Sequence, residues 1–513
     1  MHSIRRPFAA IVSSGVVALS LFVSVQRSEA ATLTVDSTAD DDGAGTTLRE
    51  AILAANANPG LDTVVLPAGT FNLDGLKGHL GVVDDLIITG AGAAQTIISG
   101  DLVNPSRIFF LDTGTNLTIE GVTIEKGSTQ FNNAGGVMQA IALGSLTIRD
   151  SVIRNNSSQF GGAIYASQNL NLGLGTITIE NTTFSGNSTR LGPGGAIRLF
   201  NNPVTITDST FIDNQSRTAG EEEASNGGAL HVTGGTLTIT GSTFSGNSAG
   251  SGPDSDAGSG GAIFVNGAEA TIVNSTISGN LAYAHGGAIA ASDGALVNLI
   301  HSTVAQNTSV LKGAGLYALS SEVPTKQGDA TGGNIDLTDS LIHNNQSAAA
   351  SNCEVVGSGT ITSAGGNLSD DATCTGLTDP TDLNDNSGTT LGALADNGGP
   401  TRTHALMAGS TAIDAVPCIQ GITDDQRDVS RPQGSGCDIG AYELVPSVGP
   451  TTTSTAIAVT TSTLIAVTTT PGAYTLPATG SRSPGSQPLI AAMLVACGVA
   501  MMLAVRRRPF SES

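Results

Sequence analysis

The stretch GGAIFVNGAEATIVNSTISGN, Gly260 to Asn280, holds one complete unit of the repeat that decides the fold. Its segments AIFV and ATIVNSTI alternate apolar residues with small or polar ones and are rich in Ile, Val, Thr and Phe. This period of two is typical of β-strands with one buried face. Gly and Asn separate the segments, as expected for tight corners that need positive φ angles.

The same unit recurs along most of the chain. In each copy an aromatic or branched apolar residue precedes an Asn by three positions, and the spacings between successive Asn are 31, 27, 33, 33, 27 and 38 residues. The seven residues are Asn156, Asn187, Asn214, Asn247, Asn280, Asn307 and Asn345. Such a period indicates a solenoid of stacked units. We expect the Asn copies to hydrogen-bond to one another in adjacent coils.

The length of the unit selects the kind of solenoid. A propeller blade needs about 40 residues and four antiparallel strands, which this unit is too short to supply. No stretch from Gly60 to Val445 carries a helical apolar period, so helical solenoids are disfavoured. We predict an all-β parallel β-helix over residues 76–390. About 12 to 14 coils, stacked about 4.8 Å apart, would span roughly 60 Å.

One clearly helical stretch precedes the first coils. TLREAILAANANPG, Thr47 to Gly60, places Leu48, Ile52 and Ala55 on one face. The open sheet edge at the end of a β-helix has to be covered. Residues 31–75 are therefore predicted to be an N-terminal cap with a short helix.

The first 30 residues have the order of a signal peptide. Two arginines are followed by an apolar run over residues 8–25 and then by small residues. This order predicts cleavage between Ala30 and Ala31. A retained N-terminal membrane anchor is the alternative.

The C-terminal region predicts attachment to the cell surface. LPATG, Leu476 to Gly480, precedes an apolar run and three arginines, and this order over residues 476–513 resembles the sorting signal of sortase-anchored proteins of Gram-positive-type bacteria. The resemblance implies that sortase cuts between Thr479 and Gly480 and joins Thr479 to the cell wall. A plain transmembrane helix over residues 488–505 is the alternative. Both place the β-helix outside the cell, on the wall or the plasma membrane.

Residues 446–475, between repeats and anchor, contain eleven Thr in thirty residues and no charge. Such a sequence cannot bury much surface, so we predict a disordered Thr-rich tether.

The excess of acidic residues argues against two kinds of binding partner. Between Ala31 and Thr479 there are 14 Lys and Arg against 41 Asp and Glu. Nucleic acids and anionic membrane surfaces are therefore not expected partners. The negative charge also favours solubility.

Cysteine usage agrees with export. Four cysteines lie outside the anchor, and pairing sequence neighbours would close loops of about 20 residues, each contributing roughly 3 kcal/mol. Three pairings are formally possible among Cys353, Cys374, Cys418 and Cys437.

Two flanking strings resemble known families of secreted proteins. TTLREAILAANANPGLDTVVLPAGTF, Thr46 to Phe71, resembles the CSLREA-type segment, with Thr46 in place of its Cys. LGALADNGGPTRTHALMAGSTAIDAVPC, Leu391 to Cys418, and DQRDVSRPQGSGCDIGAYE, Asp425 to Glu443, resemble the closing domain of choice-of-anchor Q proteins. The resemblance implies a right-handed β-helix displayed on a surface, with residues 391–445 as its closing segment. It implies no reaction.

Unequal gaps at one corner indicate a possible binding face. The gaps between the repeat Asn and the following Gly-Gly vary from 4 to 12 residues, whereas the rest of the unit barely changes. Insertions at one corner project from the same side of a solenoid. This corner ridge, our candidate binding surface, contains Arg190, Arg217, Glu221, Asp254, Asp256, Tyr283 and His285. Tolerated variation in loop length is the alternative explanation.

The pattern of ionisable residues argues for binding and against catalysis. Neither the lysines nor the histidines share an offset within successive units, so we predict no catalytic residues and no metal site. Asp254 and Asp256 are the one candidate pair for Ca²⁺. We favour a non-catalytic surface protein, an adhesin or stalk that binds a polysaccharide or another surface partner. The alternative is a surface polysaccharide lyase or glycoside hydrolase.

Overall fold

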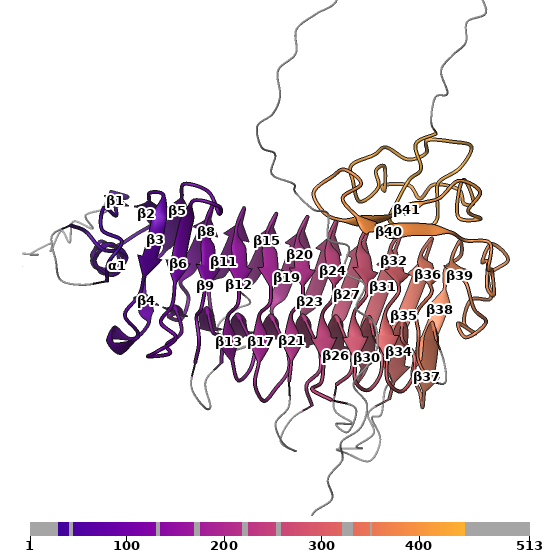
Figure 1. The fold of residues 1–513 in the computed structure, drawn as a ribbon, viewed down its shortest axis with the longest axis horizontal. Coiled ribbons are helices and arrows are strands. Elements are labelled where there is room, and N and C mark those ends of the chain that lie inside the picture. Colours follow the sequence, from indigo (N-terminus) through magenta and orange to yellow (C-terminus); the bar gives the residue numbers. More distant parts are fainter. Residues whose placement is uncertain are drawn as a thin grey trace, which may run out of the picture. The chain divides into compact units, whose positions relative to one another are not determined.

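The computed structural model describes residues 29–40, 45–129, 134–168, 175–217, 224–252, 258–320, 332–348 and 351–446 (Figure 1). They belong to one compact unit that extends to Ser447. The predicted signal residues 1–28, the tether from residue 447 and the LPATG signal with Thr479 and Gly480 lie outside the described residues. Within the described ranges, no helix is both long and apolar enough to cross a membrane.

Parallel sheets run the length of this unit, as the repeat predicts. The twelve described strands of sheet A are β1 (Thr32–Thr34), β2 (Asp62–Leu66), β5 (Leu86–Gly90), β8 (Asn116–Glu120), β11 (Ser145–Arg149), β15 (Thr176–Glu180), β19 (Pro203–Thr207), β23 (Thr236–Thr240), β27 (Glu269–Val273), β31 (Leu296–Ile300), β35 (Asn334–Thr338) and β38 (Thr360–Ser363). The eleven of sheet B are β3 (Gly69–Asn72), β6 (Thr96–Ser99), β9 (Thr123–Glu125), β12 (Val152–Arg154), β16 (Thr183–Ser185), β20 (Thr210–Ile212), β24 (Thr243–Ser245), β28 (Thr276–Ser278), β32 (Thr303–Ala305), β36 (Leu341–His343) and β39 (Leu368–Ser369).

Two further sheets complete the coil. The ten described strands of sheet C are β4 (Leu80–Val82), β7 (Phe109–Leu111), β10 (Met138–Ile141), β14 (Ile164–Ser167), β18 (Ile197–Phe200), β22 (Leu230–Thr233), β26 (Ile263–Asn266), β30 (Ile289–Ser292), β34 (Leu316–Leu319) and β37 (Cys353–Val356). The six of sheet D are β13 (Ser157–Ser158), β17 (Ser188–Thr189), β21 (Gln215–Ser216), β25 (Ser248–Ala249), β29 (Leu281–Ala282) and β33 (Thr308–Ser309).

The β-helix is shorter than we expected. The ten strands of sheet C in the described residues correspond to about ten complete coils, not 12 to 14. We expected the β-helix to continue to residue 390, but its last strand, β39, ends at Ser369. Successive coils are also unequal, and a 38-residue unit adds no more height than a 27-residue one.

Aromatic and aliphatic side chains stack along the inside of the helix. Each sheet alternates buried and less buried residues, as in Thr176–Glu180, where Ile177 and Ile179 point into the core. Three phenylalanine rings lie face to face, with centroids 4.9 Å apart for Phe184 and Phe211 and 4.7 Å apart for Phe211 and Phe244. The parallel register therefore places identical residues on top of one another.

The repeat Asn residues form the expected ladder. The side-chain amide nitrogen of Asn187 donates to the side-chain oxygen of Asn214 over 2.9 Å, and the backbone N–H of Asn187 donates to the same oxygen over 3.1 Å. The same amide also donates to the carbonyl of Ile153 one coil back. Equivalent bonds connect all seven repeat Asn residues and continue to Asn352.

The two glycines of each Gly-Gly pair meet different needs. The first has a positive φ, for example +67° at Gly227. A Cβ on the second, Gly228, would lie 2.1 Å from the carbonyl oxygen of Gly261 in the next coil. The first glycine is thus required by backbone conformation and the second by the close approach of coils.

A helix covers the N-terminal coils, as predicted. The helix α1 (Leu48–Ala57) starts with a capping box: the Thr47 hydroxyl accepts from the N–H of Glu50, and the Glu50 carboxylate accepts from the N–H of Thr47. Its buried face includes the predicted residues Leu48, Ile52 and Ala55. It contacts β2 and β4, and a short 3-10 turn, η1 (Gly75–Lys77), follows β3.

Residues 391–446 lie along the flank of the last coils. They contain the antiparallel pair β40 (Leu391–Ala395) and β41 (Thr403–Leu406), visible beside the sheets in Figure 1. Outward hydroxyls of sheet B hold the segment: Thr243 donates to the carbonyl of Arg402 and Thr276 to the side chain of Gln426, both over 2.6 Å. This closing segment therefore covers the outer face of sheet B.

Covalent and ionic contacts fix the C-terminal part. Sequence neighbours pair, as Cys353–Cys374 and Cys418–Cys437. Near Cys437, two ion pairs form, Asp425 with Arg427 at 2.6 Å and Arg431 with Glu443 at 2.9 Å. Both pairs are almost fully buried and therefore serve the fold.

Candidate functional site

One position on the outer face of sheet C carries large side chains in most coils. Strand pairing places these residues side by side along the helix, and their neighbours in each strand, such as Ile164 and Ala166 around Tyr165, point into the core. We name this row the outer strip. It consists of Phe110, Gln139, Tyr165, Arg198, His231, Phe264, Ala290, Tyr317 and Glu354.

The middle of the outer strip is built around one guanidinium group. Arg198 lies 4.8 Å from the ring centroid of Phe160 and 4.7 Å from that of Phe200. The Tyr165 ring lies 5.9 Å from the Phe200 ring. All four side chains are half-buried. Because Phe160 comes from the corner between sheets D and C, the corner ridge and the outer strip meet here and form one surface.

A cavity of about 440 Å³ lies at the N-terminal end of the outer strip. Arg107 donates to the side-chain oxygen of Gln139 and stands 5.8 Å from the Phe110 ring, which also contacts the His79 ring at 5.4 Å. Burial lowers the pKa of His79, helped by the positive charges of Arg107 and Arg49. At neutral pH this cavity therefore offers one cation, a neutral imidazole, an amide and an aromatic face. Its lining is His79, Pro105, Ser106, Arg107, Phe110, Thr129 and Gln139.

The C-terminal half of the outer strip is packed more tightly. The His231 ring stacks on Phe264 at 5.1 Å, and Phe264 and Tyr317 are only 7% and 2% exposed. Burial, together with the charge of Arg198, lowers the pKa of His231 to about 3, so this ring is neutral. The half-buried N-terminal half is therefore the better candidate for ligand contact.

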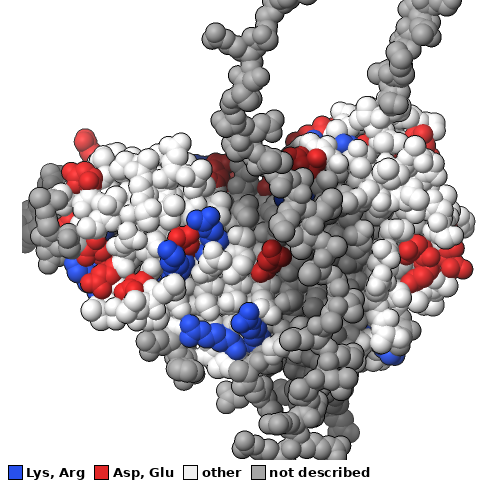
Figure 2. Space-filling view, in the orientation of Figure 1, with Lys and Arg blue, Asp and Glu red and all other residues white. Residues whose placement is uncertain are grey.

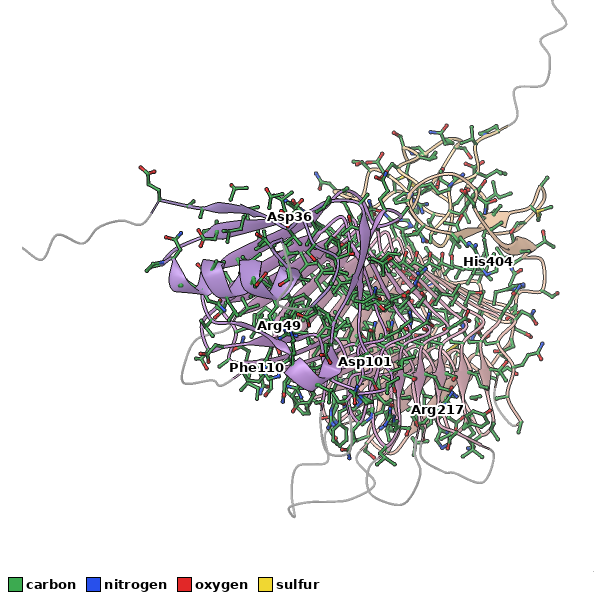
Figure 3. All side chains as sticks on the ribbon, turned by 60° about the vertical axis from the view of Figure 1, so that its left-hand side comes forward. Asp36, Arg49, Asp101, Phe110, Arg217 and His404 are labelled. Carbon is green, nitrogen blue, oxygen red and sulfur yellow. A yellow bond between two sulfur atoms is a disulfide. The ribbon has the colours of Figure 1, made fainter. Side chains whose placement is uncertain are left out.

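The structure brings part of the corner ridge to this surface. The Arg190 guanidinium donates to the hydroxyl of Ser128 over 3.1 Å, and that of Arg217 donates to the side-chain oxygen of Gln215 over 2.7 Å. Figure 3 shows Arg217 at the lower edge of the unit. Tyr283 packs against Gly250, and His285 stacks on Tyr317 at 4.3 Å. Glu221, Asp254 and Asp256 lie outside the described residues.

The charges on this side are distributed differently from those elsewhere. Figure 2 shows two basic groups on the N-terminal half of the visible face, an upper one mixed with acidic atoms and a lower one, over β13–β21, without them. On the outer face of sheet A, Arg149 pairs with Glu120 at 2.5 Å, and at the C-terminal end of the outer strip Lys312 pairs with Glu354 at 2.7 Å. Arg107, Arg190 and Arg217 instead donate to neutral oxygens. Among the residues that the structure describes, these three groups have no carboxylate partner, so the N-terminal half of this surface retains positive charge on an acidic protein.

A second cavity, of about 540 Å³, is lined by Asp40, Asp74 and Asp101. Each carboxylate already has a structural role. Asp40 pairs with Arg49 at 2.7 Å, Asp74 accepts from the N–H of Leu76, and Asp101 accepts from Asn104, whose hydrogen bond lowers the pKa of that carboxyl. Within the described ranges, no three His, Cys, Asp or Glu residues are grouped to hold a metal ion. This cavity is a weaker candidate.

The outer strip was missed by the sequence analysis, although a signal for it exists. Each residue from Tyr165 to Tyr317 stands four positions after the first glycine of a Gly-Gly or Gly-Ala pair, and five of these six are aromatic, Arg or His. The histidines and the lysines, each taken as a separate set, share no offset. Aromatic residues and Arg share the offset, and counting them together would have found the row.

The comparison with protein families supports the fold. A right-handed β-helix region matches residues 87–255. A probable autotransporter, YfaL of Escherichia coli (strain K12), is 29% identical over 136 residues, which are 24% of this chain. The chain spans about 11% of that relative's length.

The solved structures that the chain resembles are distant in sequence and in geometry. The catalytic domain of a GH87 α-1,3-glucanase in complex with tetrasaccharides has a TM-score of 0.30 and 11% identity, covering 65% of this chain and 69% of its own. The PL6 family alginate lyase AlyGC has a TM-score of 0.32 and 12% identity, covering 82% and 59% respectively. No site is transferred from either structure.

Proposed function

We propose that this protein is a non-catalytic surface or secreted β-helix that binds an extended anionic polysaccharide along the outer strip. The observation that carries the proposal is the N-terminal half of the row: one register position that presents half-buried aromatic, amide and Arg side chains in four successive coils, from Phe110 to Arg198. Aromatic faces pack on sugar rings, and Arg binds carboxylate or sulfate groups in a bidentate manner.

The geometry favours a polymer over a small ligand. Coils repeat about every 4.8 Å, so the row offers similar contacts at regular intervals along the helix axis. A chain of sugars presents its own groups at regular intervals and can contact several coils at once. Many weak contacts on one chain then add up to a useful affinity.

The charge pattern favours an anionic polymer. Within the described residues, Arg107, Arg190 and Arg217 donate to neutral oxygens and have no carboxylate partner, which leaves their positive charge to a ligand. The two disulfides and the similarity to an autotransporter support a location on the surface or outside the cell. Anchoring through sortase or a membrane helix remains part of the proposal.

The test is binding of the secreted protein to polyuronate, sulfated and neutral polysaccharides. Tyr165→Ala and Arg107→Ala should each weaken polyuronate binding at least about fivefold, since each removes about 1 kcal/mol or more of contact. Arg149→Ala, on the outer face of sheet A, is the matched control and should bind normally. New reducing ends or unsaturated uronides would instead show a hydrolase or lyase. Equal binding of neutral and anionic polysaccharides would contradict the role that the proposal gives to the positive charges.

A further inference from the structure

A buried carboxylate lies directly against the expected processing site. Asp62, the first residue of β2, is 0% exposed. Its Oδ1 atom accepts from the backbone N–H of Ala31 over 2.6 Å and from the side chain of Asn58 over 2.8 Å. Its Oδ2 atom is also buried and accepts no hydrogen bond within the described part of the chain. A buried carboxylate oxygen without a donor is costly to the fold.

The backbone around Ala31 is held in place on both sides of that residue's peptide unit. The N–H of Thr63 donates to the carbonyl of Ala31 over 2.9 Å, and β1 then pairs with β2 in register from Thr32. The two residues before Ala31, Glu29 and Ala30, are exposed. The nitrogen of Ala31 is therefore fixed at Asp62, whereas Glu29 and Ala30 are exposed and the carbonyl of Glu29 accepts one hydrogen bond from the side chain of Asn58 over 3.2 Å.

Neighbouring carboxylates already have donors. Asp84 accepts from the N–H of Gly60, and Asp85 accepts from the backbone and side chain of Asn116. Asp62 differs from Asp84 and Asp85 because, within the described part of the chain, its Oδ2 atom has no hydrogen-bond donor.

We propose that cleavage between Ala30 and Ala31 creates an ion pair between the new α-ammonium group of Ala31 and Asp62, which completes the N-terminal cap. A peptidase adds water across the Ala30–Ala31 amide: the hydroxyl goes to the carbonyl carbon of Ala30, and the C–N bond breaks. The nitrogen takes the remaining proton of water and one from solvent. The single N–H donor becomes three, enough to serve both oxygens of Asp62.

This inference rests on the predicted export signal and is independent of polysaccharide binding. It gives the cleavage a structural consequence. The precursor has one amide donor at Asp62, and the mature chain has a charged group that binds a carboxylate more strongly. The cap therefore reaches its full stability only after export.

The experiment inserts one Gly between Ala30 and Ala31, so that export leaves a Gly before Ala31 and moves the charge away from Asp62. Ala31→Gly is the matched control, because it keeps the charge in place. Intact mass should show that the secreted parent begins at Ala31. Hydrogen exchange of the β1 amides should become at least about tenfold faster in the insertion variant and remain nearly unchanged in the control.

The same insertion in an Asp62→Asn background should have little further effect. A start at another residue, unchanged exchange after insertion, or an equal effect in the Asp62→Asn background would overturn the proposal. If the Asp62→Asn variant is not secreted, the ion pair can be tested by titrating the α-amino group of the parent protein. The pKa of the α-amino group should lie above its ordinary range of about 7.7–8.0, and a value within that range would refute the ion pair.

Discussion

The side-chain oxygen of Asn280 accepts two hydrogen bonds from Asn247, one from its amide group and one from its backbone N–H, both over 2.9 Å. Both residues are almost fully buried, at 1% and 0% exposure. One amide oxygen thus satisfies two buried donors of the preceding coil. Repeated along the helix, this arrangement hydrogen-bonds the backbone at a corner that has no strand.

Replacing one Asn of the ladder should destabilise the protein mainly through the donors of the preceding Asn, which lose their acceptor. Asn247→Ala removes the oxygen that accepts from both donors of Asn214. Each buried donor without a partner costs about 1–3 kcal/mol, so we expect a loss of about 2–6 kcal/mol in the free energy of unfolding. Asn298→Ala, on the half-exposed outer face of β31, is the control. Urea unfolding measures both, and equal losses would contradict the role of the ladder.

Two glycines should respond differently to the same substitution. Gly279 has a φ of +66° with open space around a Cβ, so Gly279→Ala should cost only about 1–2 kcal/mol of backbone strain. Gly228→Ala would press a methyl group against the next coil and should cost about 3 kcal/mol or more. Thermal unfolding compares the two variants. Similar melting temperatures would show that the coils can separate to admit a methyl group.

The stability of the last coils should depend on the ionisation of Asp339. Burial raises the pKa of this carboxyl to about 7 from its ordinary value of 3.8. The folded protein therefore binds a proton that the unfolded chain has already lost, and this residue destabilises the fold increasingly as the pH rises from about 4 to 7. Asp339→Asn should stabilise the protein by about 1–3 kcal/mol at pH 8 and by nearly nothing at pH 4.

Asp293→Asn serves as the control for that change. Asp293 shares the positive φ of Asp339 but is exposed, so its variant controls for the exchange of Asp for Asn at such a backbone conformation. Burial lowers the pKa of the neighbouring His301 to about 3, and this residue destabilises the fold as the pH falls below 6.5. The Nε2 atom of His301 lies 3.4 Å from the Oδ2 atom of Asp339, so the difference between the unfolding free energies of parent and variant reports on the two groups together. A difference that does not change with pH would contradict the prediction.

The closing segment should depend on one buried amide. The side chain of Gln426 donates to the hydroxyls of Thr243 and Thr401 over 2.9 and 2.8 Å and accepts from that of Thr276. Gln426→Ala leaves several of these groups without partners, so we expect a local loss of about 2–4 kcal/mol. Limited proteolysis within residues 391–446 should become faster. Gln433→Ala, at a half-exposed site, should be cleaved like the parent.

The sequence was sufficient to predict what the repeat encodes. The Asn ladder, the buried face of α1 and the parallel coils follow from residues that recur at fixed offsets, and the structure confirms them. The docking of the closing segment could not be predicted, because it depends on contacts such as Thr276 with Gln426, 150 residues apart. The outer strip was encoded but lay in strands that we interpreted as scaffold. Contacts such as those of Arg198 with Phe160 and Phe200 form only when the coils stack, so the sequence alone does not show them.

The position of the closing segment determines how the unit would bear a load. Its contacts run from Gly241 through Thr276 and Thr303 to Asp339, across four successive coils. A pull on the chain beyond Pro446 would therefore reach the β-helix through hydrogen bonds to several coils. Had the chain left directly from β39, the same pull would peel the last coil away one bond at a time. A surface protein held under flow would resist detachment better with the first arrangement.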